Sequence, residues 1–271
     1  MRRRRPGDGD GRRAPQLRSD FHAEEHGEGE PLLLLQGLGQ GKWAWRYVLP
    51  DLARRFRTIL FDTRGTGQRP PPAEPYGVAD LADDTAQVLG GRSAHVIGFS
   101  MGGYVALTLA QSRPELVRSL VLAGTGAGGP DRVPRPRHVR EAFQQAFGLP
   151  PEEFGRATMP YTFSPGWPET HPERFEEILG ARLEHPTPDT TLVAHTEACY
   201  GFYDEGRAVE EIGVPALVVH GDADLIVPVE NGRMLAARLP NAQYVELKRR
   251  GHNLMLEDPE TFTSLVLDFL T

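Results

Sequence analysis

One short segment of this 271-residue chain has the residue types that nucleophilic catalysis requires. Ser100 stands between two glycines in the run Gly98-Phe-Ser-Met-Gly102. The apolar residues 94–97 before it predict a strand, and residues 101–111 after it predict a helix. A serine on such a turn holds its hydroxyl above the sheet, and the helix start offers N–H groups to a developing oxyanion. The segment predicts a nucleophile; a serine that only caps the helix is the alternative.

A serine hydroxyl needs a base close by before it can act as a nucleophile. His252 lies in the loop between the last predicted strand and the last predicted helix, where its side chain can hang over the edge of the sheet. The other histidines are not expected to act as this base. His95 and His220 lie inside predicted strands and should pack there, whereas solvated or lid positions are expected for His22, His26, His138, His171, His185 and His195.

The base in turn needs a carboxylate that fixes its tautomer and stabilises its charge. Two candidates, Asp222 and Asp224, follow the strand predicted at residues 216–220. Either one would lie at the carboxyl end of that strand. The chain order Ser, Asp, His is the order expected for such a site on a strand–turn–helix scaffold.

Strand-length apolar runs alternate with helical patterns along most of the chain. Strands are predicted at 31–35, 58–61, 94–97, 118–123, 216–220 and 243–247, and helices at 43–56, 78–89, 101–111, 230–238 and 259–270. Continuous apolar strands separated by helices indicate a parallel sheet covered on both faces. The alternation breaks between residues 129 and 212, where only short helical patterns occur, at 139–147 and 172–183. We expect this insertion to lie over the carboxyl ends of the strands, where such sheets bind ligands.

Composition narrows the function classes further. Residues 1–18 carry seven arginines and almost no apolar residues, which predicts a disordered tail and leaves the rest of the chain strongly acidic. An acidic body argues against nucleic-acid binding. The longest strongly apolar run, residues 32–35, is far too short to cross a membrane, and no apolar signal core follows the arginines. We therefore expect a cytoplasmic protein; its single cysteine excludes an internal disulfide.

Four motifs together resemble the α/β-hydrolase superfamily, in particular its bacterial esterase, enol-lactonase and cofactor-free haloperoxidase group. The motifs are QGLG at 36–39, DTRGTG at 62–67, GFSMGG at 98–103, and GDADLIVP at 221–228 with GHNLMLEDP at 251–259. The resemblance covers about residues 28–271. It implies an α/β-hydrolase fold, a mostly parallel doubly wound sheet with a helical lid inserted after the sixth strand. We expect the core at 19–129 and 213–271, and the lid at 130–212.

The resemblance also implies roles for individual residues. It favours Asp224 over Asp222 as the acid, because the family's acid stands three residues after the glycine of GDADLIVP. It implies an oxyanion hole formed by the backbone N–H groups of Leu38 and Met101. The family often has His-Gly where this chain has Gln36-Gly37, which removes an imidazole that stabilises the loop. Asp62 and Arg64 resemble a pair that braces the loops beneath the site.

The chemistry implied is acyl transfer through Ser100, Asp224 and His252, without a metal or an organic cofactor. Specificity is assigned to the aromatic-rich lid, and Phe143, Met159 and Trp167 are the candidates for contact with substrate. Apolar lid residues favour a small, uncharged, moderately hydrophobic ester, thioester or lactone. The only partner expected is this small molecule, with no nucleic acid and no membrane, and the protein is expected to be a monomer or a homodimer.

Three other functions remain open at this point. The same triad serves C–C bond hydrolases that act on β-diketone-like compounds, and it serves perhydrolases. A third possibility is a ligand-binding sensor on the hydrolase scaffold, which would turn over slowly or not at all. These alternatives stay open because a fold alone does not fix a function. Turnover number separates the sensor from the enzymes, because a sensor would not cycle at ordinary rates.

Overall fold

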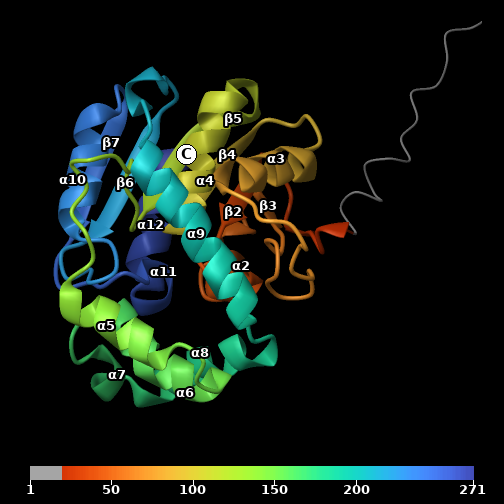
Figure 1. Cartoon of the computed structure of the whole chain (residues 1–271). Helices are drawn as coiled ribbons and strands as arrows, with labels where there is room; N and C mark the ends of the chain where they lie inside the picture. Colours follow the sequence, from red (N-terminus) through yellow and green to blue (C-terminus); the bar gives the residue numbers. More distant parts are fainter. Residues whose placement is uncertain (1–19) are drawn as a thin grey trace, which may run out of the picture.

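The computed structural model of the chain describes residues 20–271, so the predicted tail at 1–18 lies outside the described part. Within residues 20–271, seven strands form one sheet in the order β1-β3-β2-β4-β5-β6-β7 (Figure 1). Their bounds are β1 Glu24–His26, β2 Pro31–Leu35, β3 Arg57–Leu60, β4 Ala94–Phe99, β5 Val117–Ala123, β6 Ala216–Gly221 and β7 Ala242–Leu247. β1 pairs antiparallel with β3, and every other pair is parallel. The mostly parallel sheet is confirmed.

Helices connect the strands and fill the insertion. The α-helices are α2 Leu49–Leu52, α3 Val78–Leu89, α4 Met101–Ser112, α5 Arg137–Ala146, α6 Pro151–Thr158, α7 Trp167–Thr170, α8 Pro172–Glu184, α9 Asp189–Glu205, α10 Val229–Arg238, α11 Leu254–Glu257 and α12 Pro259–Leu270. Short 3-10 turns are η1 Lys42–Trp45, η2 Pro114–Leu116, η3 Met159–Thr162 and η4 Val209–Glu211. Among residues 20–271, none of these helices is long and apolar enough to cross a membrane.

The central strands are apolar at consecutive positions because both of their faces are buried. In β2, Leu33 and Leu35 join a core that includes residues of α3 and α4. Leu32 and Leu34 point the other way, into a core that includes residues of α2 and α12. Alternate side chains of a strand lie on opposite faces of the sheet, so a strand covered on both sides has no polar position in its middle.

The insertion between β5 and β6 contains α5 to α9 and no strand. Figure 1 shows α5, α6, α7 and α8 gathered below the sheet in this view, and α9 running from them back across the core. The insertion follows the fifth described strand and not the sixth, because β1 is the only strand ahead of β2 within residues 20–271. The lid boundaries at 130 and 212 stay a prediction.

Candidate active site

Ser100 occupies the turn between β4 and α4 with φ 54° and ψ −119°, a conformation that residues other than glycine rarely adopt. Hydrogen bonds to Ala123 and Thr125, at the end of β5 and just after it, help to hold its backbone there. Its N–H donates to the carbonyl oxygen of Ala123 at 2.9 Å, and its own carbonyl accepts from the Thr125 hydroxyl at 2.9 Å. Such a conformation costs about 1–3 kcal/mol and persists only when its surroundings impose it.

The two glycines that flank Ser100 allow the chain to pack this tightly. A Cβ atom added at Gly102 would lie 2.1 Å from the carbonyl oxygen of Leu35 at the end of β2. A Cβ atom at Gly98 would lie 2.5 Å from the carbonyl oxygen of Gly102. Both contacts are too short for any side chain, so the glycines bring the start of α4 directly against the sheet.

The structure brings together the three predicted side chains from three separate loops. His252 Nε2 lies 3.0 Å from Ser100 Oγ, and His252 Nδ1 lies 2.7 Å from Asp224 Oδ2. A carboxylate accepts hydrogen bonds, so the proton of the neutral imidazole is on Nδ1 and the lone pair of Nε2 faces the serine hydroxyl. Asp222 lies elsewhere: its Oδ1 accepts the N–H of Arg249 at 2.5 Å.

The carboxylate of Asp224 is buried and fully bonded. Its Oδ1 accepts the N–H groups of Ile226 at 2.8 Å and Val227 at 2.9 Å. Burial alone would raise the pKa of Asp224, but the charge of His252 and the hydrogen bonds from both His220 and His252 hold it well below its usual range. The group is therefore an anion at neutral pH.

His220 is packed, as expected, but it also contacts Asp224, which was not expected. Its Nε2 lies 3.2 Å from Asp224 Oδ2 and 2.8 Å from the carbonyl oxygen of Val227. Both neighbours are acceptors, so Nε2 carries the proton; its N–H bonds the Val227 carbonyl and also faces Asp224 Oδ2. The sequence did contain a signal for this contact, since His220 stands near the end of β6, only four residues before Asp224.

The two predicted oxyanion donors face no competing acceptor. Neither the N–H of Leu38 nor the N–H of Met101 donates to any acceptor within residues 20–271. Met101 opens α4 directly after Ser100 with its side chain buried in the core, and Leu38 lines the cavity described below. Backbone N–H groups without an acceptor are the kind of donor that a tetrahedral oxyanion requires.

Side-chain amides support the loop that lacks the family's histidine. Gln36 Nε2 donates to the carbonyl oxygen of Phe61 at 2.9 Å. Gln40 Oε1 accepts the N–H of Gly37 at 3.1 Å, and Gln40 Nε2 donates to Asn253 Oδ1 at 3.2 Å. Because Asn253 follows His252, these amides connect the Leu38 loop to the loop of the base.

His195, for which a solvated or lid position was expected, lies in α9 of the insertion and supplies an imidazole to the same loop. It is fully buried, its Nδ1 accepts the N–H of Gly39 at 3.2 Å, and its Nε2 lies 3.1 Å from the carbonyl oxygen of Arg64. Burial lowers its pKa to about 4, so it is neutral at physiological pH. Thr187 donates to the Gly39 carbonyl at 2.9 Å, so the insertion holds both polar groups of this glycine.

Asp62 and Arg64 both brace their loop, but they do so through different partners and not through each other. Arg64 makes a bidentate pair with Asp84 of α3, with Nε–Oδ2 and NH2–Oδ1 distances of 2.7 and 2.9 Å. Asp62 accepts the N–H of Gln68 at 3.1 Å and lies 3.7 Å from Lys42 Nζ. The two side chains leave the loop in different directions, and each braces it against a different neighbour.

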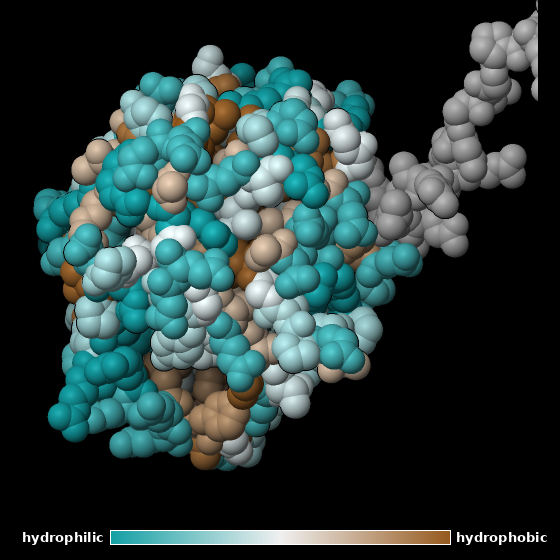
Figure 2. Space-filling view, turned by 45° about the horizontal axis from the view of Figure 1, so that its top comes forward, coloured by the Kyte–Doolittle hydropathy of each residue, from teal (hydrophilic) through white to brown (hydrophobic). Residues whose placement is uncertain are grey.

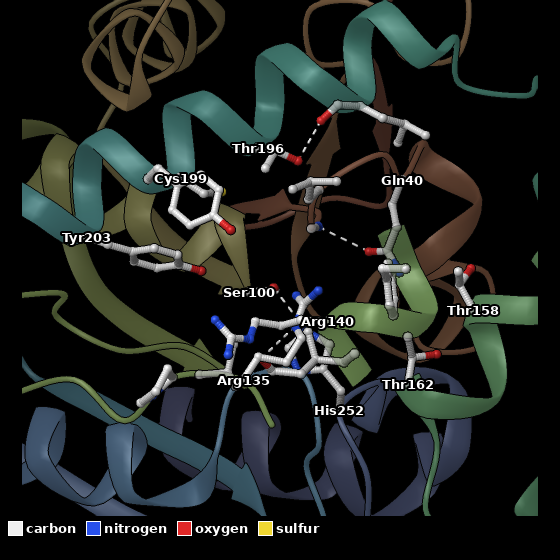
Figure 3. Close-up of a pocket in the computed structure, with 18 of the residues that line it drawn as sticks. Gln40, Ser100, Arg135, Arg140, Thr158, Thr162, Thr196, Cys199, Tyr203 and His252 are labelled. Atoms are coloured by element: carbon white, nitrogen blue, oxygen red, sulfur yellow. Dashed lines mark hydrogen bonds between the residues drawn. The ribbon is translucent and has the colours of Figure 1, made fainter. Parts of the chain in front are cut away.

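A cavity of about 710 Å³ adjoins Ser100 and His252, between the sheet and the insertion. Figure 2 shows a hollow on this side of the molecule with apolar groups at its rim. In Figure 3, Thr196, Cys199 and Tyr203 of α9 form the wall opposite His252. The volume of the cavity is typical of small-molecule sites. Within residues 20–271, no group of three His, Cys, Asp or Glu side chains is arranged to hold a metal ion.

Two of the three predicted lid contacts line this cavity. Phe143 of α5 and Met159 of η3 are part of its wall. Trp167 is not: it is buried between Phe163 and His171, with ring centroids 4.3 and 4.8 Å away and both rings stacked. Trp167 belongs to the core beneath the insertion, because a large ring with two stacked neighbours is a packing residue.

Comparison with known proteins agrees with this geometry. The model of the alpha/beta hydrolase family matches residues 32–265. The chain is 31% identical over 254 residues to the "Putative carbamate hydrolase RutD" of Azorhizobium caulinodans, covering 93% of this chain and 95% of the relative. It is 34% identical over 265 residues to the 2-hydroxy-6-oxononadienedioate/2-hydroxy-6-oxononatrienedioate hydrolase of Burkholderia vietnamiensis, covering 92% of this chain and 90% of that relative. The enol-lactonase of Burkholderia xenovorans LB400 superposes with a TM-score of 0.79 at 27% identity, covering 92% and 96%. The chain belongs to the alpha/beta hydrolase family.

Proposed function

We propose that this protein is a serine hydrolase that cleaves small carboxylic esters or lactones. The observation that carries the proposal is the continuous contact from Asp224 through His252 to Ser100, at 2.7 and 3.0 Å, on the wall of a cavity sized for a small molecule. A buried carboxylate, an imidazole in the right tautomer and a hydroxyl on a strained turn have no common structural purpose. Together they fit general-base activation of a nucleophile.

The proposed mechanism has two halves. Ser100 Oγ attacks the carbonyl carbon while His252 Nε2 takes its proton, and the N–H groups of Leu38 and Met101 hold the oxyanion. His252 then protonates the leaving alcohol, and an acyl group stays on Ser100. Water, activated by the same imidazole, attacks the acyl group and releases the acid. Asp224 stabilises the imidazolium in both halves.

Intact mass after treatment with a fluorophosphonate tests the nucleophile. One adduct is expected on the wild type and none on Ser100→Ala, which removes only the attacking oxygen. In parallel, p-nitrophenyl esters of increasing acyl length are expected to be hydrolysed by the wild type alone. A wild type that is neither labelled nor active on any of these esters would contradict the proposal.

Hydrolysis of a carbon–carbon bond is the second candidate, and the relative from Burkholderia vietnamiensis supports it. That relative is named as a hydrolase of 2-hydroxy-6-oxononadienedioate and is 34% identical. The three side chains would be the same, and the substrate would differ. Labelling of Ser100 without ester turnover, together with loss of the conjugated chromophore of such an oxo-dienoate, would favour this candidate. Labelling without turnover of either substrate would favour a sensor.

A further inference from the structure

Four arginines line the cavity and have no acidic partner. Arg132, Arg135, Arg140 and Arg182 belong to its wall, and no carboxylate within residues 20–271 forms an ion pair with any of them. The chain as a whole carries a net charge of −7, so these cations are not part of a generally basic surface. The wall also contains Glu197 and the Arg137–Glu141 ion pair, so its positive charges outnumber its negative ones.

Arg135 is half-buried and is held in place by neutral groups. Its Nε donates to the carbonyl oxygen of Ile226 at 3.3 Å, and its guanidinium lies over the Phe143 ring at 4.8 Å from the centroid. Burial raises the pKa of the Cys199 thiol to about 12, and the positive charge of Arg135 opposes that rise. The charge of Arg135 therefore acts across the cavity, on the wall that α9 forms.

Arg140 of α5 has no side-chain hydrogen bond or ion pair within the described residues. Figure 3 shows it and Arg135 projecting into the cavity, where Ser100 and His252 also lie. Its neighbour on the same helix behaves differently: Arg137 pairs with Glu141, Nε to Oε1, at 2.7 Å. A charge that extends into a cavity without a counter-ion is free to bind one from solution.

The other two cations are balanced by aromatic rings in place of carboxylates. The guanidinium of Arg132 lies 4.5 Å from the Tyr203 centroid, and that of Arg182 lies 5.4 Å from the Phe154 centroid. Burial lowers the pKa of Arg182 to about 10. An aromatic face offsets only part of the cost of removing a cation from water. An anion that enters the cavity would supply the remainder.

We propose that the cavity selects substrates that carry a carboxylate, bound by Arg135 and Arg140 while the scissile carbonyl lies at Ser100. Guanidinium groups bind carboxylates through charge-assisted, often bidentate hydrogen bonds. The proposal rests on the proposed function and names its substrate class: a monoester of a dicarboxylic acid, or a lactone that carries a free carboxylate. It replaces the expectation of an uncharged substrate, which the aromatic content of the insertion had suggested.

A matched pair of esters tests the selection. Mono-p-nitrophenyl glutarate and p-nitrophenyl valerate differ only in a carboxylate that replaces a methyl group. We expect the wild type to have the higher kcat/KM on the glutarate ester. In Arg135→Gln and Arg140→Gln the ratio of the two kcat/KM values is expected to fall about 10-fold to 100-fold, the usual range for one charged hydrogen bond. Arg140→Lys should keep part of the preference.

Arg156→Gln is the matched control. Arg156 is also a cation of the insertion, but it pairs with Glu152 and Glu176 on the outer surface and is not part of the cavity wall. We expect its ratio to equal that of the wild type, and thermal melting of every variant verifies folding. A wild type that prefers the valerate ester would overturn the proposal. So would arginine variants that change both esters by the same factor.

Binding of free glutarate separates this proposal from the proposed function. Isothermal titration on Ser100→Ala needs no catalysis. Glutarate binding that Arg135→Gln or Arg140→Gln abolishes supports the anion site, even if fluorophosphonate labelling has failed. Absence of glutarate binding in proteins whose cavity arginines are intact overturns the anion site, even if simple esters are hydrolysed.

Discussion

Asp224 lies between two imidazoles, His252 and His220, and it accepts two backbone N–H groups as well. Two backbone donors occupy Oδ1, and both imidazoles face Oδ2, so the carboxylate has no free position for a proton. Each imidazole must then present a donor to it, which leaves the far nitrogen of His252 as an acceptor. The position of Asp224 thus determines which nitrogen of the neutral His252 ring carries the proton and which one faces Ser100.

Asp224→Asn should lower kcat on esters by on the order of 10⁴, because an amide can present a donor to His252 and favour the wrong tautomer. Asp222→Asn is the control, since its carboxylate bonds the N–H of Arg249 and does not touch His252. Steady-state kinetics on one ester compares the two variants. A larger loss in the Asp222 variant would reverse the assignment of the acid.

Ser100→Gly should be more stable than Ser100→Ala by about 1 kcal/mol in free energy of unfolding. Glycine adopts the observed φ of 54° and ψ of −119° without the steric cost that a Cβ imposes. Chemical denaturation of both inactive variants measures the difference. Equal stabilities would mean that the turn relaxes around alanine and stores no strain.

At the level of residues, the sequence contained the parts of the site that are local in the chain. The glycines around Ser100 indicate a tight turn. Asp224 and His252 lie in the loop motifs that follow β6 and β7. The contacts of His195 and His220 depend on tertiary packing, and no spacing within a short segment encodes the distance between Gly39 and residue 195. The positive cavity was missed because Arg132, Arg135 and Arg140, although close in sequence, show no pattern that says they face a cavity without acidic partners.

At the scale of elements, α9 connects the insertion to the candidate oxyanion loop. Thr187, just before the helix, and His195 within it bond the carbonyl and the N–H of Gly39. The same imidazole reaches the carbonyl of Arg64, so one side chain braces two loops of the core. The helix is therefore part of the support of the site, besides being one wall of the cavity.

Acid should destabilise the wild type more than it destabilises His195→Gln. Between about pH 6.5 and about pH 4, the free energy of unfolding should decrease by up to about 3 kcal/mol more in the wild type than in the variant. The pKa of His195 is about 4 in the folded protein against an ordinary value of 6.5. In that range the unfolded chain binds a proton that the folded protein does not, so acid favours unfolding. Glutamine removes this titration.

Urea denaturation of both proteins at about pH 7 and about pH 4.5 measures the effect. His195→Gln should be the less stable of the two at the higher pH, because it loses buried hydrogen bonds. The gap should narrow at the lower pH. A gap that is constant across the two conditions would contradict a neutral, buried imidazole.

The helices predicted at 78–89 and 259–270 coincide with α3 and α12, whereas α9 was not predicted at all. The buried stripe of α9 is regular, but it contains polar residues. Its members are Thr191, Leu192, His195, Ala198, Cys199 and Phe202. A pattern search that counts only apolar side chains does not register a threonine and a histidine as core positions, although their hydrogen bonds allow them to be buried.

At the scale of the whole molecule, every contact described for the candidate site is made within residues 20–271. The arginine-rich residues 1–18 contribute none of the groups that the proposed mechanism uses. Deleting residues 1–18 should therefore leave kcat/KM on a neutral ester and the melting temperature unchanged. A collapse of either quantity in the shortened protein would assign the tail a role in the fold or the site. The cytoplasmic location stays a prediction.

The bonds from α9 to Gly39 bear on how such a protein can diversify. Exchange of the insertion for that of a relative would replace most of the cavity wall at once. Here the exchanged segment would also remove Thr187 and His195 from Gly39. A hybrid that keeps this loop in place would need its new insertion to supply an acceptor for the Gly39 N–H. The segment that lines the cavity and the segment that supports the candidate oxyanion loop are therefore exchanged together.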